Sequence, residues 1–180
     1  MRIEIISGSP RHVSVTKRLA VYLQQFFTDK TEHSIGLIDM REHELPMVQT
    51  VFSSPDKAPE QYRELAGRMF AADAFIIVTP EYNGSYSPAM KNLFDHFPKR
   101  VHKPIGLVTA SVGALGGMRA AQQLLLLTAG VFGIASPFML VTPFVDKKFA
   151  EDGTLLDESF QANVDTFVHE FLWLAEKLNG

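Results

Sequence analysis

Sulfur chemistry and strong charge are both missing from this chain. Its 180 residues include no cysteine, which excludes disulfides, thiolate zinc sites, iron–sulfur clusters and a cysteine nucleophile. The 17 basic and 20 acidic side chains leave a formal net charge of −3. So small a charge indicates neither a polyanion-binding surface nor an acidic tail, and nucleic acid is therefore not an expected partner.

An export signal and a membrane span are not expected either. Glu4 interrupts the N-terminal segment, where a secretory signal needs an apolar run of about 7 to 15 residues, so the predicted location is cytoplasmic. The stretch 120–145 has no charged residue and is long enough to cross a bilayer. It also contains two prolines and two glutamines, and it divides into a helix to about Phe132 and a strand from about Pro137. We expect a buried helix followed by a buried strand.

Short apolar runs alternate with segments of helical periodicity along the whole chain. All the runs but the second are nearly continuous in apolar or β-branched residues, which is typical of strands covered on both faces. With 46% hydrophobic residues, the pattern predicts one domain, residues 1–180, with a three-layer α/β fold and a doubly wound, five-stranded parallel sheet. The expected strands are Ile3–Ser7, Ser34–Ile38, Ala74–Thr79, Ile105–Thr109 and Phe138–Val141.

Two loops and one helix stand out from this regular pattern. The segments 39–58 and 142–158 are longer than the usual connection of about two to six residues, and loops of this length are either mobile or functional. The helix around Leu124–Leu127 is apolar on every face. Two explanations stay open for it: burial under the last strand and the C-terminal helix, or contact with another subunit.

The loop after the first strand has the composition of an anion site. In open α/β sheets, ligands bind beyond the carboxyl ends of the strands. Hydroxyls of Ser9, Ser14 and Thr16, the guanidinium of Arg11 and the N-terminus of the following helix could together cradle a phosphate. The segment is neither a P-loop nor a dinucleotide glycine motif. A plain turn with Ser14 as the N-cap is the alternative.

Two further loops follow the third and fourth strands. The segment 79–88 offers two tyrosines, an asparagine and a glycine, which suit a planar heteroaromatic ring, and it ends at Ser87 and Pro88, the expected N-cap and first residue of a helix. The segment 110–120 is rich in small residues, so that its backbone N–H groups could converge on an acceptor. Either could also be an ordinary turn. The three loops together are stronger evidence for a ligand site than any one of them.

Other catalytic sites find little support in the sequence. His169 and Glu170 lack the second histidine of a zinc-protease helix, and the remaining histidines show no ligand spacing. The stretch 84–87 does not fit the nucleophile elbow of hydrolases. Neither a metal nor a catalytic side chain is expected.

The three loops resemble those of the NADPH-dependent FMN reductase family, flavodoxin-like proteins that include quinone, azo-dye and chromate reductases. The family pattern Gly-Ser-x-Arg and Ser-x-Thr matches Gly8–Thr16, Pro-Glu-Tyr-Asn-Gly-Ser matches Pro80–Ser85, and Gly-x-x-Gly-Gly-x-Arg matches Gly113–Arg119. The resemblance extends to about residue 142. His96 departs from it, because the family often has tryptophan there.

The resemblance implies a flavodoxin-like strand order 2-1-3-4-5 and a bound FMN, with NADPH or NADH as the reductant. The first loop would hold the FMN phosphate, the second would lie along the flavin ring, and the third would contact its pyrimidine side. The implied FMN-binding residues are Ser9, Pro10, Arg11, Ser14, Val15, Thr16, Pro80, Glu81, Tyr82, Asn83, Gly84, Ser111, Val112, Gly113, Gly116 and Gly117.

The implied function is that of an FMN-dependent NAD(P)H oxidoreductase. A hydride would pass from NAD(P)H to FMN, and the electrons would then reach a quinone, an azo compound, free flavin or a similar small acceptor by a ping-pong mechanism. The implied assembly is a homodimer or homotetramer without a membrane partner. The alternatives are a non-enzymatic FMN-binding electron carrier or flavin sensor, and a nucleotide- or sugar-phosphate-binding domain that uses only the first loop.

Overall fold

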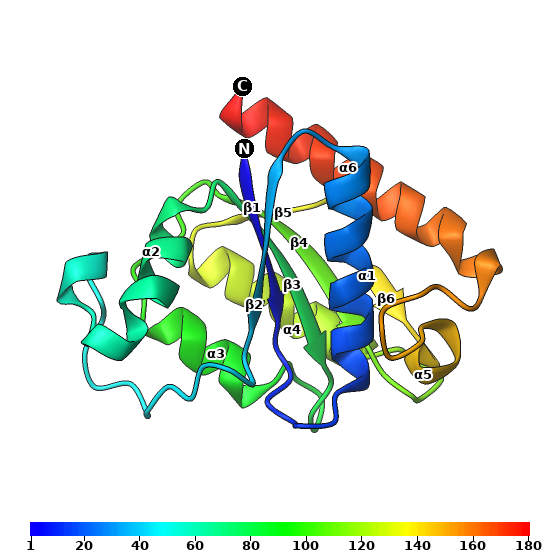
Figure 1. The fold of residues 1–180 in the computed structure, drawn as a ribbon, viewed down its shortest axis with the longest axis horizontal. Coiled ribbons are helices and arrows are strands. Elements are labelled where there is room, and N and C mark those ends of the chain that lie inside the picture. Colours follow the sequence, from blue (N-terminus) through cyan, green and yellow to red (C-terminus); the bar gives the residue numbers. More distant parts are fainter.

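A parallel β-sheet between two layers of helices makes up the structure, a computed structural model that describes residues 1–180 (Figure 1). The strands are β1 (Arg2–Ser7), β2 (Ser34–Asp39), β3 (Ala74–Pro80), β4 (Pro104–Ala110), β5 (Ile134–Ala135) and β6 (Leu140–Thr142). The α-helices are α1 (Val15–Lys30), α2 (Arg63–Ala71), α3 (Pro88–Asp95), α4 (Met118–Gly130), α5 (Val145–Lys148) and α6 (Gln161–Asn179). Short 3₁₀ turns occur at Pro55–Lys57, Glu60–Tyr62 and Glu158–Phe160.

The strand order is β2-β1-β3-β4-β5, with every pair parallel, and β6 also pairs with β4. The predicted order 2-1-3-4-5 is therefore confirmed. The last strand differs from the prediction, because it begins earlier and is broken into β5 and β6. Between the two pieces, residues 136–139 lie opposite only residues 106–107 of β4. Pro137 falls in this break, where it need not donate a ladder hydrogen bond.

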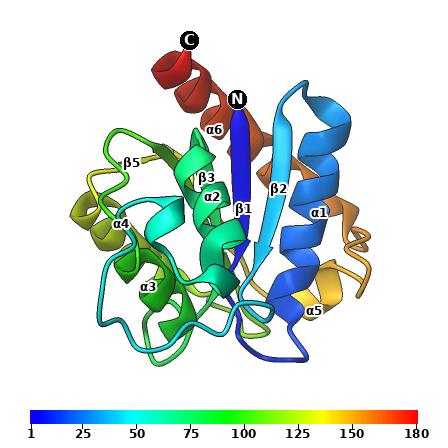
Figure 2. The same cartoon turned by 60° about the vertical axis from the view of Figure 1, so that its left-hand side comes forward.

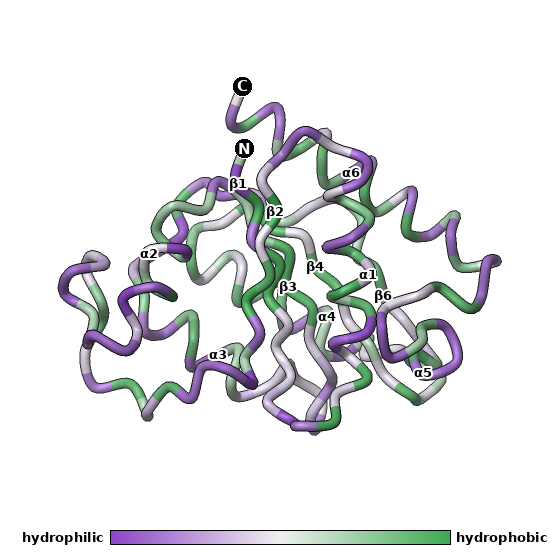
Figure 3. Tube along the Cα trace, in the orientation of Figure 1, coloured by the Kyte–Doolittle hydropathy of each residue, from purple (hydrophilic) through white to green (hydrophobic).

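The central strands β3 and β4 are buried on both faces, which explains why their sequences are almost continuously apolar. Every residue of β3 and β4 is buried, and hydrophobic residues concentrate along these central strands (Figure 3). Helices α1 and α6 cover one face, whereas α2, α3 and α4 cover the other (Figure 2). The strand–helix alternation in the sequence predicted these layers correctly.

Helix α4 lies on the opposite side of the sheet from the C-terminal helix. Its inner residues Leu124 and Leu127 belong to the same buried cluster as Leu93 of α3. Of the two explanations that the sequence left open, burial under the C-terminal helix is therefore wrong. The outward residues Leu125 and Leu126 are 40% and 66% exposed, so the expectation of a fully buried helix holds for one face only. No helix of the structure is both long and apolar enough to cross a membrane.

The long loop 40–54 is tied to helices α2 and α3 rather than free. The Asn92 side chain donates hydrogen bonds to the carbonyls of Leu45 and Pro46, at 3.1 and 2.9 Å. The Tyr62 hydroxyl donates to the carbonyl of Glu44 at 2.7 Å, and the buried ring of Phe52 lies 5.0 Å from that of His96. These contacts make the loop part of the packed structure.

The second long loop, 142–158, also packs against the core. It contains α5 and the fully buried Phe149, whose ring lies 5.1 Å from that of Tyr22 and 6.1 Å from that of Phe160. Arg18 donates to the Phe149 carbonyl at 3.1 Å. The loop therefore closes the end of the α1 and α6 layer.

We expect Phe171→Ala to destabilise the protein by about 3–5 kcal/mol, because it empties a fully buried site between Phe27 and Phe167. Trp173→Ala on the same helix is the control: Trp173 is 52% exposed, so the expected loss is under about 1 kcal/mol. Urea unfolding followed by circular dichroism measures both. Equal losses in the two variants would contradict the placement of the core.

Candidate functional site

The loops after β1, β3 and β4 meet at the carboxyl edge of the sheet, around one open cavity of about 180 Å³. Parallel neighbours end at the same edge, which is why three segments far apart in the sequence come together. The residues around the cavity are Ser9, Arg11, Val13, Ser14, Val15, Thr16, Pro80, Glu81, Tyr82, Ala110, Ser111 and Val112. The structure thus brings together residues of all three predicted loops.

Six predicted site residues do not line this cavity, although several of them adjoin residues that do: Pro10, Asn83, Gly84, Gly113, Gly116 and Gly117. For Gly116 and Gly117 the structure gives another reason for glycine. Both have positive φ, and an added Cβ would lie 2.7 Å from the backbone nitrogen of Pro143 at the first position and 2.9 Å from Thr109 Cβ at the second. They let the third loop pack tightly against the sheet. Val13 and Ala110 line the cavity although they were not predicted, and both lie inside the predicted loops.

The first loop presents a row of free donors. Ser14 is the N-cap of the 16-residue helix α1 and accepts from the Lys17 N–H at 3.2 Å. The backbone N–H groups of residues 12–16 donate no hydrogen bond within the chain. The guanidinium of Arg11 lies 4.8 Å from the centre of the Tyr82 ring, at the rim of the same cavity. This donor set suits the chemistry of a phosphate.

The second loop is a tight hairpin that is linked to the third. Tyr82 and Ser85 exchange backbone hydrogen bonds of 2.8 and 3.1 Å across Asn83 and Gly84, both of which have positive φ. The Glu81 carboxylate accepts from the Arg119 N–H at 3.2 Å, at the N-terminus of α4, and lies 3.7 Å from the Arg119 guanidinium. The two loops on either side of the cavity are therefore held at a set separation.

One buried polar atom at the cavity lacks a partner. The Tyr82 hydroxyl is buried and makes no hydrogen bond within the chain. An orphaned buried hydroxyl is unfavourable unless another group pairs with it. Tyr82 is one of the residues that line the cavity, so this unpaired hydroxyl belongs to the cavity wall. This observation and the donor row of the first loop both fit a phosphorylated ligand with a polar ring.

A buried carboxylate at the end of β2, that of Asp39, holds Arg41, which in turn binds the first loop. Asp39 is 3% exposed and receives hydrogen bonds from Arg41 Nη2 at 2.6 Å and Nε at 3.0 Å, with Lys17 Nζ also at 3.0 Å. Burial by itself would raise the pKa of Asp39, but the bonds from Arg41 and Lys17 outweigh it and hold the pKa below its usual value. Arg41 Nη1 also donates to the His12 carbonyl at 3.0 Å.

The strand order defines a flavodoxin-like domain, and the three loops at the carboxyl edge of its sheet have donors and apolar surface that suit a phosphorylated, planar ligand. A family model described as "NADPH-dependent FMN reductase" matches residues 1–141. The chain belongs to this family, as the loop motifs predicted.

Named relatives cover nearly the whole chain. The FMN-dependent NADPH-azoreductase of Staphylococcus aureus (strain USA300) is 34% identical over 176 residues, which cover 93% of this chain and 92% of the relative. The NADPH azoreductase of Bacillus sp. (strain OY1-2) is 30% identical over 161 residues, covering 88% and 84%.

Solved structures agree in fold. The flavoenzyme FerB, an NAD(P)H:(acceptor) oxidoreductase from Paracoccus denitrificans, superposes with a TM-score of 0.81 at 26% identity and covers 98% of this chain and 97% of its own. A flavodoxin from Pseudomonas aeruginosa, at 18% identity and a TM-score of 0.58, covers both chains completely and shares the fold. The chain is thus a flavodoxin-like enzyme, an oxidoreductase that uses FMN and NADPH.

We expect Asp39→Asn to lower the free energy of unfolding at pH 7. The folded-state pKa of Asp39 is depressed, so its contribution is present above the unfolded pKa of about 3.9 and is lost as the pH falls through the folded value. The gap between wild type and variant should therefore close towards pH 3. Urea unfolding at both pH values measures it. A gap that is the same at pH 3 and pH 7 would show that the ionised carboxylate is not what matters.

Proposed function

We propose that the cavity at the carboxyl edge of the sheet holds FMN and that the chain reduces azo compounds, quinones or free flavin with NADPH. The observation that carries this proposal is the convergence of residues from all three loop motifs on one cavity. Bound FMN supplies the redox chemistry, since it can take a hydride from a nicotinamide and pass electrons to an acceptor. The whole chain, residues 1–180, serves as one FMN-binding domain in this proposal.

The first loop would hold the phosphate. The free N–H groups of residues 12–16 and the positive end of the α1 dipole favour a doubly charged anion. Arg11 adds a full positive charge, and the hydroxyls of Ser9 and Thr16 add two short donors. Ser9, Arg11 and residues 13–16 line the cavity.

The second and third loops would hold the ring between them. Tyr82 and Val112 supply flat and apolar surface, and the Tyr82 hydroxyl would pair with a polar ring atom. Arg119 and the N-terminus of α4 compensate the charge of Glu81. An unpaired carboxylate beside the ring would oppose extra electron density on it, so this pairing favours reduction.

Both substrates would use the same side of the cavity in turn, in a ping-pong sequence. The apolar side chains of Val112, Leu115 and Met118 in the third loop are 57%, 62% and 42% exposed, and they offer a surface for flat molecules such as a nicotinamide or an azo dye. The relatives are azoreductases by name, which supports an azo compound as one acceptor. The cytoplasmic location inferred from the sequence stays a prediction.

We expect Arg11→Gln to weaken FMN binding about tenfold or more, because it removes one charge-assisted hydrogen bond to the phosphate. Quenching of flavin fluorescence measures the affinity. Arg63→Gln, which removes an exposed arginine of α2, is the matched control and should bind FMN as wild type does. Riboflavin, which lacks the phosphate, should bind the wild type and Arg11→Gln equally.

The reductase activity has its own test. NADPH added without oxygen should bleach the FMN-loaded protein, and steady NADPH oxidation should follow when menadione or an azo dye is added. Double-reciprocal plots at several acceptor concentrations should be parallel. A protein that binds FMN but is not bleached would be a carrier or sensor and not a reductase.

The outer face of α4 supports a homodimer or homotetramer. Leu125, Leu126 and Phe132 are 40%, 66% and 60% exposed, and a hollow of about 320 Å³ lies between α3 and α4. Tyr86 and Leu127 line this hollow with the paired Lys91 and Asp95. An exposed apolar patch bordered by charges is typical of a subunit contact.

We expect Leu126→Glu to shift the protein towards a monomer, because a two-fold contact brings both copies of the new charge into one interface. Light scattering after gel filtration measures the mass. Leu178→Glu, at a half-exposed position on α6 in the other helix layer, should keep the wild-type mass. A monomeric wild type at micromolar concentration would refute the assembly.

A further inference from the structure

The guanidinium of Arg119, at the start of helix α4, makes no hydrogen bond within the chain. The backbone N–H of Arg119 donates to Glu81 Oε2 at 3.2 Å, whereas Arg119 Nη1 lies 3.7 Å from Glu81 Oε1. At that separation the two side chains form an ion pair without a hydrogen bond. The Arg119 side chain is 67% exposed, so all five of its N–H donors are available to a ligand.

This guanidinium lies directly beside the proposed FMN site. Glu81, its ion-pair partner, lines the proposed FMN cavity. A Cβ added to Gly84 would lie 3.8 Å from Arg119 Cδ, so the stem of the arginine passes next to the tip of the second loop. The free cation therefore stands between the second loop and α4, next to the proposed place of the flavin ring.

We propose that Arg119 selects electron acceptors that carry an anionic group, such as an azo compound with a carboxylate or a sulfonate on one of its rings. The inference rests on the proposed function, because it names the residue that distinguishes one acceptor from another at the same cavity. Two further observations support it: the other basic side chains near the loops are engaged, and an apolar surface adjoins Arg119.

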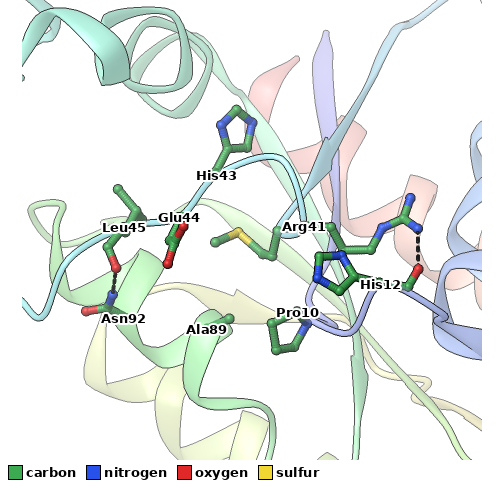
Figure 4. Close-up of a pocket in the computed structure, with 9 residues that line it drawn as sticks. Pro10, His12, Arg41, His43, Glu44, Leu45, Ala89 and Asn92 are labelled. Atoms are coloured by element: carbon green, nitrogen blue, oxygen red, sulfur yellow. Dashed lines mark hydrogen bonds between the residues drawn. The ribbon is translucent and has the colours of Figure 1, made fainter.

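Basic side chains behind the first loop have their counter-charge within the chain. A second cavity, of about 340 Å³, is lined by Pro10 and His12 of the first loop together with Arg41 (Figure 4). Arg41 donates to the His12 carbonyl at 3.0 Å and to the Asp39 carboxylate at 2.6 Å. Lys17 pairs with the same carboxylate at 3.0 Å. These two cations are therefore held by the protein itself.

Of the remaining arginines near the loops, only Arg119 is left without a role in binding FMN or in packing. Arg18 donates to the Phe149 carbonyl at 3.1 Å. Arg11 lies 4.8 Å from the centre of the Tyr82 ring and lines the proposed FMN cavity, where it serves the phosphate. Arg119 is thus the cation that remains for a second ligand.

An exposed apolar surface leads up to Arg119 along the third loop. Val112, Leu115 and Met118 are 57%, 62% and 42% exposed, and the Met118 N–H donates to the Leu115 carbonyl at 3.0 Å, one residue before Arg119. A flat aromatic acid has the same arrangement, with an apolar ring next to a carboxylate or a sulfonate. The planar fork of a guanidinium can donate to two oxygens of such a group. An uncharged acceptor of the same shape gains no such bond.

Isothermal titration of the FMN-loaded protein, without NADPH, tests the site directly. The ligands are para-methyl red, an azo dye with one carboxylate, and its uncharged carboxamide. We expect the wild type to bind the carboxylate about fivefold or more tightly, because only this dye pairs with the guanidinium. The preference should fall at high salt, since the site is open to solvent.

Variants show whether Arg119 is the cause. Arg119→Gln should bind the two dyes alike, through loss of affinity for the carboxylate alone. Arg119→Lys should keep part of the preference, because it retains the charge but not the fork. Arg63→Gln removes an exposed arginine of α2 by the same substitution and should bind both dyes as wild type does.

Kinetics give a second measurement. The ratio of kcat/KM for the carboxylate dye to kcat/KM for the carboxamide should fall about fivefold or more in Arg119→Gln. Any effect of the variant on flavin reduction cancels in this ratio, because both dyes are reduced by the same form of the enzyme.

Three results would overturn the proposal. Equal affinity of the wild type for the two dyes does so, even if Arg119→Gln fails to fold. A loss for both dyes alike in Arg119→Gln would show that the arginine acts only by holding Glu81. A matching loss of affinity for NADP⁺ in Arg119→Gln, in the same titration, would assign the guanidinium to the reductant and not to the acceptor.

The two proposals can fail separately. A protein that reduces azo dyes but binds the carboxylate and the carboxamide alike keeps the proposed function and loses the role of Arg119. A protein that binds the carboxylate dye through Arg119 but is not bleached by NADPH keeps the anion site and loses the reductase function.

Discussion

The buried hydroxyl of Ser87 sets the relative position of the loops on which the site depends. It donates to the Gly8 carbonyl and accepts from the Met90 N–H at 3.1 Å, while the Ser87 N–H donates to Thr79 Oγ1, also at 3.1 Å. One residue therefore caps α3 and ties the first loop to the end of β3. An added Cβ at Gly8 would lie 2.3 Å from Met90 Cε and 3.2 Å from the carbonyl of Val78, so a side chain at this position would displace the end of the Met90 side chain. The anion cradle and the hairpin beside it stand opposite each other because of this contact.

At this edge of the sheet, two carboxylates are paired with basic groups. Glu81 is paired with Arg119 and the N-terminus of α4, and Asp39 is paired with Arg41 and Lys17. Each of these two carboxylates lies at the carboxyl edge of the sheet, close to the loops of the proposed FMN site. Pairing removes the repulsion and at the same time holds a cation in a useful orientation. The Asp39–Lys17 and Glu81–Arg119 pairs also connect elements that are distant in the sequence.

The loop motifs were predictable because each occupies a short, continuous piece of sequence. Ser9, Arg11 and Ser14 lie within six residues of one another, and the hairpin at Asn83 and Gly84 follows from residues that favour positive φ. Other features had no such local signal. The cavity lined by Arg41, His12 and Asn92 combines three segments of the chain, and the broken last strand depends on how residues 136–139 lie against β4. The short helix α5 and the anchoring of the 40–54 loop through Asn92 were not predicted either.

By itself, the sequence determined the parallel sheet, its helices and the three loops at its carboxyl edge, because apolar runs and turn residues act over a few positions. Only the tertiary structure decided which face of the sheet α4 covers, and therefore that Leu126 points outward. It also decided that Asp39 forms ion pairs with Lys17 and Arg41 and that residues of the first loop line two separate cavities. These features arise between segments that are far apart in the chain, where packing and burial set the outcome and no local pattern records it.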